Sequence, residues 1–129
     1  SMKLGETNTQ VLIKQGVILE ELERFPDAVR VYQRVLVTQS KPSADILFKI
    51  GRIQLENLNQ IALAIKTLNR VIKHQANHSE ALYKLGYALK DVGRDKEARN
   101  VFNKLLATKP SSEIRDEIEQ EVAGLSRRP

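Results

Sequence analysis

The sequence predicts an all-α fold assembled from repeated helix pairs, and three observations carry this prediction. Apolar residues recur at spacings of three and four along nearly the whole chain, which is typical of helices with one buried face. No stretch alternates between apolar and polar residues with a period of two, so no strand is expected. Gly16, Gly51 and Gly86 are separated by 35 residues each time, which indicates an internal repeat.

The composition is that of a globular protein. The 129 residues are 41% hydrophobic and 29% charged, which is enough apolar material for one buried core. No apolar run approaches the roughly 18 residues of a membrane span, and the start shows no signal-peptide pattern. Because cysteine is absent, disulfides and thiolate metal sites are excluded. We expect a cytoplasmic or otherwise intracellular protein.

The charge is distributed unevenly. Residues 1–111 hold 18 basic and 11 acidic side chains, whereas residues 112–125 hold five acids against Arg115. A basic body favours acidic partners, either protein or nucleic acid, although a solvated charged surface would have the same composition.

The first four helices are separated by recognisable breaks. The first is expected to begin at Thr9 and to end before Pro26, which suits the first turn of the second helix because its missing N–H needs no partner there. Residues 40–43 end the second helix, and Ser43 is the expected cap of the third. A turn at residues 57–60 separates the third helix from the fourth.

The last three helices follow a loop at residues 74–78, where Asn77 and Ser79 are turn and cap candidates. The fifth and sixth helices flank a turn at Gly93 and end at Pro110. The seventh helix carries one apolar stripe, with acids elsewhere. The stripe consists of Ile114, Ile118, Val122 and Leu125.

These breaks divide the chain into six parts. They are a disordered or tag-derived terminus (1–8), three helix-pair units (9–43, 44–78 and 79–112), a C-terminal capping helix (113–125) and a basic tail (126–129). The terminus begins with Ser1 and Met2, which we interpret as a cloning remnant.

Aligned on their glycines, the three units share one template. Each glycine is followed by a small residue, then by a ring or branched side chain, then by a further apolar residue. The three sets are Ala28, Tyr32 and Val35; Ala64, Leu68 and Val71; and Ala98, Phe102 and Leu105. A glycine inside a helix costs about 1 kcal/mol relative to alanine, so its recurrence indicates close approach of the paired helix.

This template resembles the tetratricopeptide repeat, with its Leu-Gly pair, later alanine, aromatic residue and final proline. The resemblance covers residues 9–112 and is best in the third unit. It implies a right-handed α-α superhelix of three antiparallel helix pairs, closed by the seventh helix as a cap. Gln15 and Ile50 depart from the pattern at the leucine position, and Gln54 stands where an apolar residue is usual.

The resemblance also implies where a partner binds, because the first helix of each pair lines the concave face in this family. On that face, lysines recur beside a row of apolar and aromatic side chains, which would suit a peptide or helix with acidic and apolar character. The alternative is that the lysines are solvated and the rings pack between units. The predicted partner-binding residues are Ile13, Lys14, Val17, Phe48, Lys49, Arg52, Tyr83, Lys84 and Tyr87.

Some members of the family hold a chaperone's C-terminal carboxylate with a clamp of Lys and Asn in the first unit, Asn in the second, and Lys and Arg in the third. We expect no such clamp here, since only the last of the corresponding positions is close to a match. These positions carry Ile13, Val17, Lys49, Glu80 and Lys84.

No motif supports catalysis. The chain has no Gly-rich phosphate loop, zinc-protease signature or Gly-x-Ser-x-Gly turn. His74 and His78 are four residues apart but lack a third ligand, so we expect no metal site and no cofactor. The chain is predicted to be an interaction scaffold and not an enzyme.

Two alternatives remain open at this stage. The first is self-assembly through the uncapped end of the first unit, either with a second copy or within a longer array. The second is polyanion or nucleic-acid binding by basic second helices, although aromatic stacking residues are absent from that surface. The basic residues are Arg30, Arg34, Lys66, Arg70, Lys73, Arg99 and Lys104.

Overall fold

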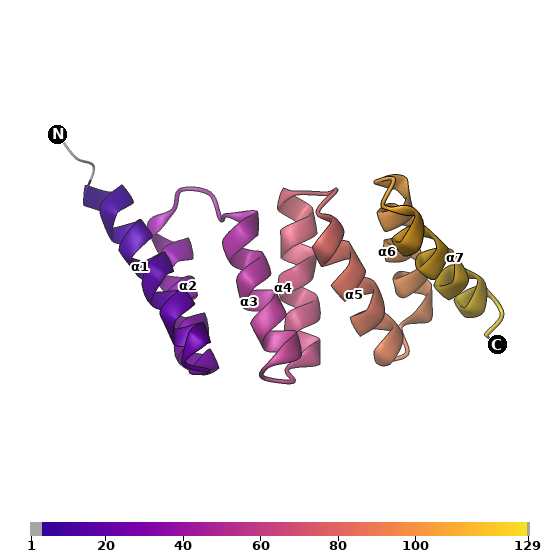
Figure 1. Cartoon of the computed structure of the whole chain (residues 1–129), viewed down its shortest axis with the longest axis horizontal. Helices are drawn as coiled ribbons and strands as arrows, with labels where there is room; N and C mark the ends of the chain where they lie inside the picture. The colour runs from indigo at the N-terminus through magenta and orange to yellow at the C-terminus, as the bar shows by residue number, and fades with distance from the viewer. Residues whose placement is uncertain (1–3, 129) are drawn as a thin grey trace. The chain divides into compact units, whose positions relative to one another are not determined.

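The computed structural model describes residues 4–128, which form seven α-helices and no strand (Figure 1). The predicted all-α class is therefore confirmed for this part of the chain. The structure divides into two compact units, residues 1–70 (the first unit) and residues 71–129 (the second unit), which are distinct from the three helix pairs of the repeat. The helices are α1 (Leu4–Glu21), α2 (Phe25–Thr38), α3 (Ala44–Glu56), α4 (Ile61–His74), α5 (Ser79–Asp91), α6 (Asp95–Ala107) and α7 (Ser112–Ser126).

In the first unit, α1 and α2 pack against each other at Gly16. The Tyr32 ring covers this glycine so closely that a Cβ placed there would lie 2.3 Å from Cε1 of Tyr32. At the end of the pair that lies away from its turn, the hydroxyls of Thr9 and Thr38 are hydrogen-bonded at 3.0 Å. The core continues into α3 through Ile46, Ile50 and Ile53.

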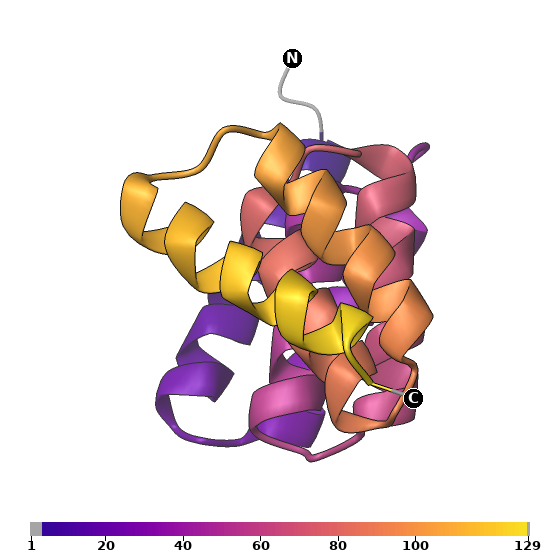
Figure 2. The same cartoon turned by 90° about the vertical axis from the view of Figure 1, so that its right-hand side faces the viewer.

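In the second unit, α5 and α6 repeat this packing at Gly86, where a Cβ would lie 2.3 Å from Cε1 of Phe102. Helix α7 then runs beside α6 (Figure 2). It buries Ile118 and Leu125, which are 0% and 4% exposed. The predicted stripe is thus the face that α7 packs inward.

The α3–α4 pair uses the same glycine position with a looser contact. A Cβ on Gly51 would lie 3.0 Å from Cδ2 of Leu68, which is a flexible side chain and not a ring. Gln54, an unusual residue for its position, is buried and accepts a hydrogen bond of 2.7 Å from Oγ1 of Thr67. Because this hydrogen bond satisfies the amide oxygen, a polar residue is tolerated in the core.

Most predicted helix ends agree with the structure, with two corrections. Ser43 caps α3 as predicted, accepting the Ile46 N–H at 3.4 Å. The cap of α5 is His78 and not Ser79 or Asn77, because the imidazole Nδ1 accepts the Ala81 N–H at 3.1 Å.

The second correction concerns the N-terminus. Helix α1 begins at Leu4 and not at Thr9, so residues 4–8 are helical where a disordered end was predicted. A polar sequence can start a helix because the N–H groups of a first turn need no partner within the helix. The predicted remnant, Ser1 and Met2, lies outside the described residues.

Two turns inside the helix pairs share an unusual backbone conformation. Glu23 has φ 57° and Gly93 has φ 80°, and both occupy the same repeat position. In each turn the next residue donates a 2.8 Å backbone hydrogen bond, from Arg24 to Leu19 and from Arg94 to Leu89. The left-handed conformation suits glycine and is unfavourable for a glutamate.

Candidate partner-binding surface

The nine predicted binding residues lie on the first helices of the three pairs. Lys14 is exposed and the other eight are half-buried. The structure groups them in threes, on α1, α3 and α5. These groups are Ile13, Lys14 and Val17; Phe48, Lys49 and Arg52; and Tyr83, Lys84 and Tyr87.

In the first unit, two cations of the predicted surface contact the preceding helix pair. Nζ of Lys49 lies 5.8 Å from the centre of the Tyr32 ring. The Arg52 guanidinium is 2.7 Å from Oε1 of Glu20, and both side chains are mostly buried. The Tyr32 hydroxyl donates to the other oxygen of Glu20 at 2.5 Å. Burial, followed by this hydrogen bond, raises the pKa of Tyr32. Lys49 and Arg52 therefore help to hold α3 against α1 and α2.

In the second unit, the two tyrosines of the predicted surface converge on a carboxylate of α7. The Tyr83 hydroxyl donates to Oε2 of Glu117 at 2.6 Å, and the Tyr87 hydroxyl donates to the same oxygen. These hydrogen bonds lower the pKa of Glu117. The pKa of Tyr83 is raised mainly by its hydrogen bond, and that of Tyr87 mainly by burial.

Sequence reasoning missed Glu117, because it assigned the acids of α7 to the solvent side. The signal was present, since Glu117 and Glu121 are four residues apart and share a helical face. Glu121 pairs with Lys90 of α5 at 2.6 Å. Two carboxylates of α7 thus occupy part of the α5 surface that was predicted to attract an acidic partner.

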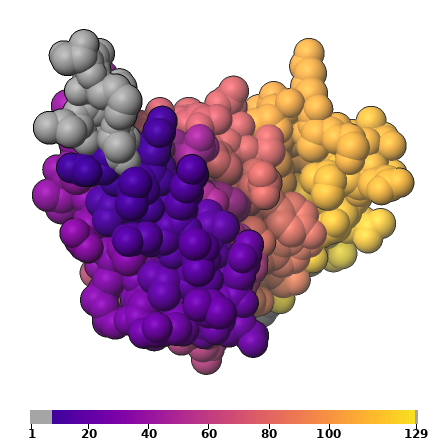
Figure 3. Space-filling view, turned by 60° about the vertical axis from the view of Figure 1, so that its left-hand side comes forward, coloured from indigo at the N-terminus to yellow at the C-terminus, as the bar shows by residue number. Residues whose placement is uncertain are grey.

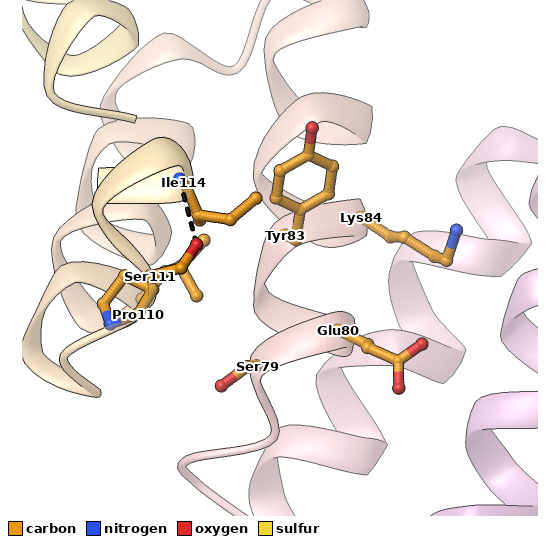
Figure 4. Close-up of a pocket in the computed structure, with 8 residues that line it drawn as sticks. Ser79, Glu80, Tyr83, Lys84, Pro110, Ser111 and Ile114 are labelled. Atoms are coloured by element: carbon orange, nitrogen blue, oxygen red, sulfur yellow. Dashed lines mark hydrogen bonds between the residues drawn. The ribbon is translucent and has the colours of Figure 1, made fainter. Parts of the chain in front are cut away.

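A pocket of about 390 Å³ lies between α5 and the turn that leads into α7 (Figure 4). Its lining is apolar where Leu105, Pro110, Ile114 and the Tyr83 ring meet. Figure 4 shows Glu80 and Lys84 projecting on the opposite side of Tyr83 from Pro110 and Ile114. The remaining lining residues are Ser79 and Ser111.

The pocket depends on how α7 begins. Lys109 adopts φ 57° before Pro110, and the chain reverses there. Oγ of Ser111 then accepts the Ile114 N–H at 3.3 Å, which caps α7 (Figure 4). The cap places Ile114 at the wall of the pocket, opposite the first turn of α5.

Six of the seven basic side chains on the second helices are exposed, and Arg99 is half-buried. Arg34, Lys66 and Lys104 are exposed, and Arg30 is paired with Asp27 of its own helix. Within residues 4–128, no group of three or more metal-ligating side chains is assembled. The imidazole of His78 is used as the cap of α5. Among the described residues, no helix has the length and apolar character to cross a bilayer.

A comparison with protein families matches residues 55–113 to the tetratricopeptide repeat. A curated relative is the probable UDP-N-acetylglucosamine–peptide N-acetylglucosaminyltransferase SPINDLY of Solanum lycopersicum. The two are 32% identical over 94 residues, which is 73% of this chain and 10% of the relative. The chain therefore spans about a tenth of the length of that relative.

Solved structures with the same fold include two tetratricopeptide domains of RPAP3. The first domain of Spaghetti (RPAP3), bound to the HSP90 peptide SRMEEVD, gives a TM-score of 0.76 at 16% identity, over 93% of this chain and 94% of that one. The second domain of human RPAP3, in complex with the HSP70 peptide SGPTIEEVD, gives a TM-score of 0.77 at 16% identity, over 96% of this chain and 99% of that one. At these identities the likeness establishes the fold.

Proposed function

Because this chain belongs to the tetratricopeptide-repeat proteins, we propose that it is a non-catalytic scaffold that binds a peptide or helix of another protein on its first helices. The two RPAP3 domains support this proposal, since each is described in complex with a short peptide that contains Glu-Glu-Val-Asp. The chain lacks the clamp residues expected for a chaperone tail, so its partner must be recognised by other contacts.

The pocket beside Tyr83 is the observation that carries the proposal. Its volume of about 390 Å³ and its apolar lining suit one apolar side chain of a partner. Lys84 on the rim favours a carboxylate next to that side chain, whereas Glu80 on the same rim disfavours one. The proposed partner segment therefore has an apolar anchor with an acidic neighbour on the Lys84 side.

A displayed library of random peptides tests this chemistry directly, because the selection requires no identified partner. Selection on the 129-residue chain should enrich peptides in which Leu, Ile or Phe is followed or preceded by Asp or Glu. Enrichment of basic peptides, or no enrichment, would contradict the proposal.

Point variants then locate the binding site of a selected peptide. Ile114→Trp should fill the pocket and weaken binding at least about tenfold, because the anchor loses its cavity. Lys84→Gln should lower the affinity for an acidic peptide, and Glu80→Gln should raise this affinity, each by a few-fold at low salt. Circular dichroism must show unchanged helicity in all three.

A matched pair of variants separates the surface from overall charge. Lys84→Glu should abolish peptide binding, whereas Lys104→Glu makes the same change in charge on the second helix of the same pair and should not. If Lys104→Glu abolished binding instead, or if RNA bound with a steep salt dependence that this change removed, the polyanion alternative would replace the proposal.

A further inference from the structure

Helix α1 carries an uncovered apolar stripe on one face. Val11, Ile18 and Leu22 are 48%, 53% and 62% exposed, which is unusual for large apolar side chains that share a helical face. Lys14 and Glu21 are exposed beside them. Figure 3 shows α1 at the front of the first unit, with its side chains forming the surface.

The repeat shows what these positions are used for. Ile46 and Ile53 of α3 lie 35 residues after Val11 and Ile18, and they are only 4% and 0% exposed. They belong to the cluster formed with the preceding pair, α1 and α2. The stripe on α1 therefore has the positions of an interior face, and no described residue of the first unit covers it.

We propose that a second copy of the chain covers this face, with α1 packed antiparallel against α1 of the other copy. The charges on the helix favour this direction. Within the stripe from Val11 to Leu22, Lys14 lies nearer the N-terminal end and Glu21 nearer the C-terminal end, so antiparallel stripes place each Lys14 opposite the Glu21 of the other copy. A parallel arrangement would place like charges together.

A head-to-tail arrangement is disfavoured by the outer face of α7. Arg115, Asp116, Glu119 and Gln120 are exposed there, and a polar face is a poor cover for the apolar stripe. The contact is thus isologous, which means that the same surface is used twice and that assembly stops at the dimer. One helix face is small beside the ~800 Å² per partner of a standard interface, so the dimer is weak.

Sedimentation velocity of the 129-residue chain, from about 10 µM to about 1 mM, tests the proposal, since a weak dimer is populated only at high concentration. The expected result is a monomer–dimer equilibrium. Ile18→Glu should raise the dimer Kd at least about 100-fold, because it places two carboxylates in an apolar contact. Leu63→Glu is the matched control, since Leu63 of α4 is 47% exposed and lies outside the stripe.

A charge exchange tests the direction of the helices. Lys14→Glu and Glu21→Lys should each weaken the dimer several-fold, and the double variant should restore it. Absence of rescue would overturn the antiparallel arrangement. A monomer at every concentration, growth beyond the dimer, or equal effects of Ile18→Glu and Leu63→Glu would overturn the interface.

Discussion

The first and third helix pairs are packed alike and linked differently to the next helix. Each pair places an aromatic ring, Tyr32 or Phe102, on a glycine at the same distance. In the first unit the ring carries the hydroxyl, which bonds Glu20 on α1. In the second unit the ring is a phenylalanine, and the hydroxyls come from α5 and bond Glu117 on α7. The apolar contact is the fixed part of the repeat, and the polar link varies.

An ion pair recurs at equivalent positions with its charges exchanged. Glu20 of α1 pairs with Arg52 of α3 at 2.7 Å, and Lys90 of α5 pairs with Glu121 of α7 at 2.6 Å. Lys90 lies 70 residues after Glu20, at the same place in the repeat. In these two pairs the partners carry opposite charges, and the side that carries the acid is exchanged. The sign of the pair is specific to each junction.

The largest effect is expected from adding a methyl group under the ring. Gly86→Ala should lower the free energy of unfolding by about 2 to 3 kcal/mol, because the buried Phe102 ring cannot move away from the new Cβ. Gly51→Ala should stay within about 1 kcal/mol of wild type, since Leu68 can shift and alanine favours the helix. Urea unfolding followed by circular dichroism measures both values.

A second-site change sharpens this contrast. Phe102→Leu copies the Gly51–Leu68 contact into the second unit, so Gly86→Ala combined with Phe102→Leu should cost less than the sum of the two single variants. A coupling of at least about 1 kcal/mol is expected for such neighbours. If the effects simply added, the ring would not be the reason for the glycine.

The exchanged ion pairs give the next largest effect. Lys90→Glu should lower the free energy of unfolding by about 1 kcal/mol, because it sets two carboxylates together at a partly buried contact. Lys90→Glu with Glu121→Lys should recover most of this loss. Glu20→Lys with Arg52→Glu should recover less, since lysine cannot accept the hydrogen bond of the Tyr32 hydroxyl. Equal recovery in the two units would contradict the distinction between them.

The glycines, alanines and rings could be predicted from the sequence because their spacing is the same in all three helix pairs, apart from one extra residue before Ala64. Glu117 could not, because its contact depends on the rotation of α7 about its own axis, which an amphipathic stripe defines only coarsely. The cap of α5 was misassigned because Ser79 is the commoner cap type, whereas the geometry gives the role to His78.

The turns of the two pairs align residue for residue, with Glu23 and Gly93 at the positive-φ position, which permits a reciprocal exchange. Glu23→Gly should raise the free energy of unfolding by about 0.5 kcal/mol, because it removes a left-handed glutamate but frees the unfolded chain. Gly93→Glu should lower it by about 1 kcal/mol. Thermal unfolding of both variants checks the two signs, and two changes of the same sign would mean that the turns are not equivalent.

The smallest effect concerns the link that is specific to the second unit. Hydrogen bonds from Tyr83 and Tyr87 hold the pKa of Glu117 below its ordinary value of about 4.3. This stabilisation is fully present above the unfolded pKa and is lost as pH falls through the lower folded pKa. The stability difference between wild type and Glu117→Gln should therefore be constant above about pH 5 and shrink towards pH 3. Glu119→Gln, an exposed change on the same helix, is the control. If both variants showed the same pH profile, the hydrogen bonds to α5 would not be what holds Glu117 ionised.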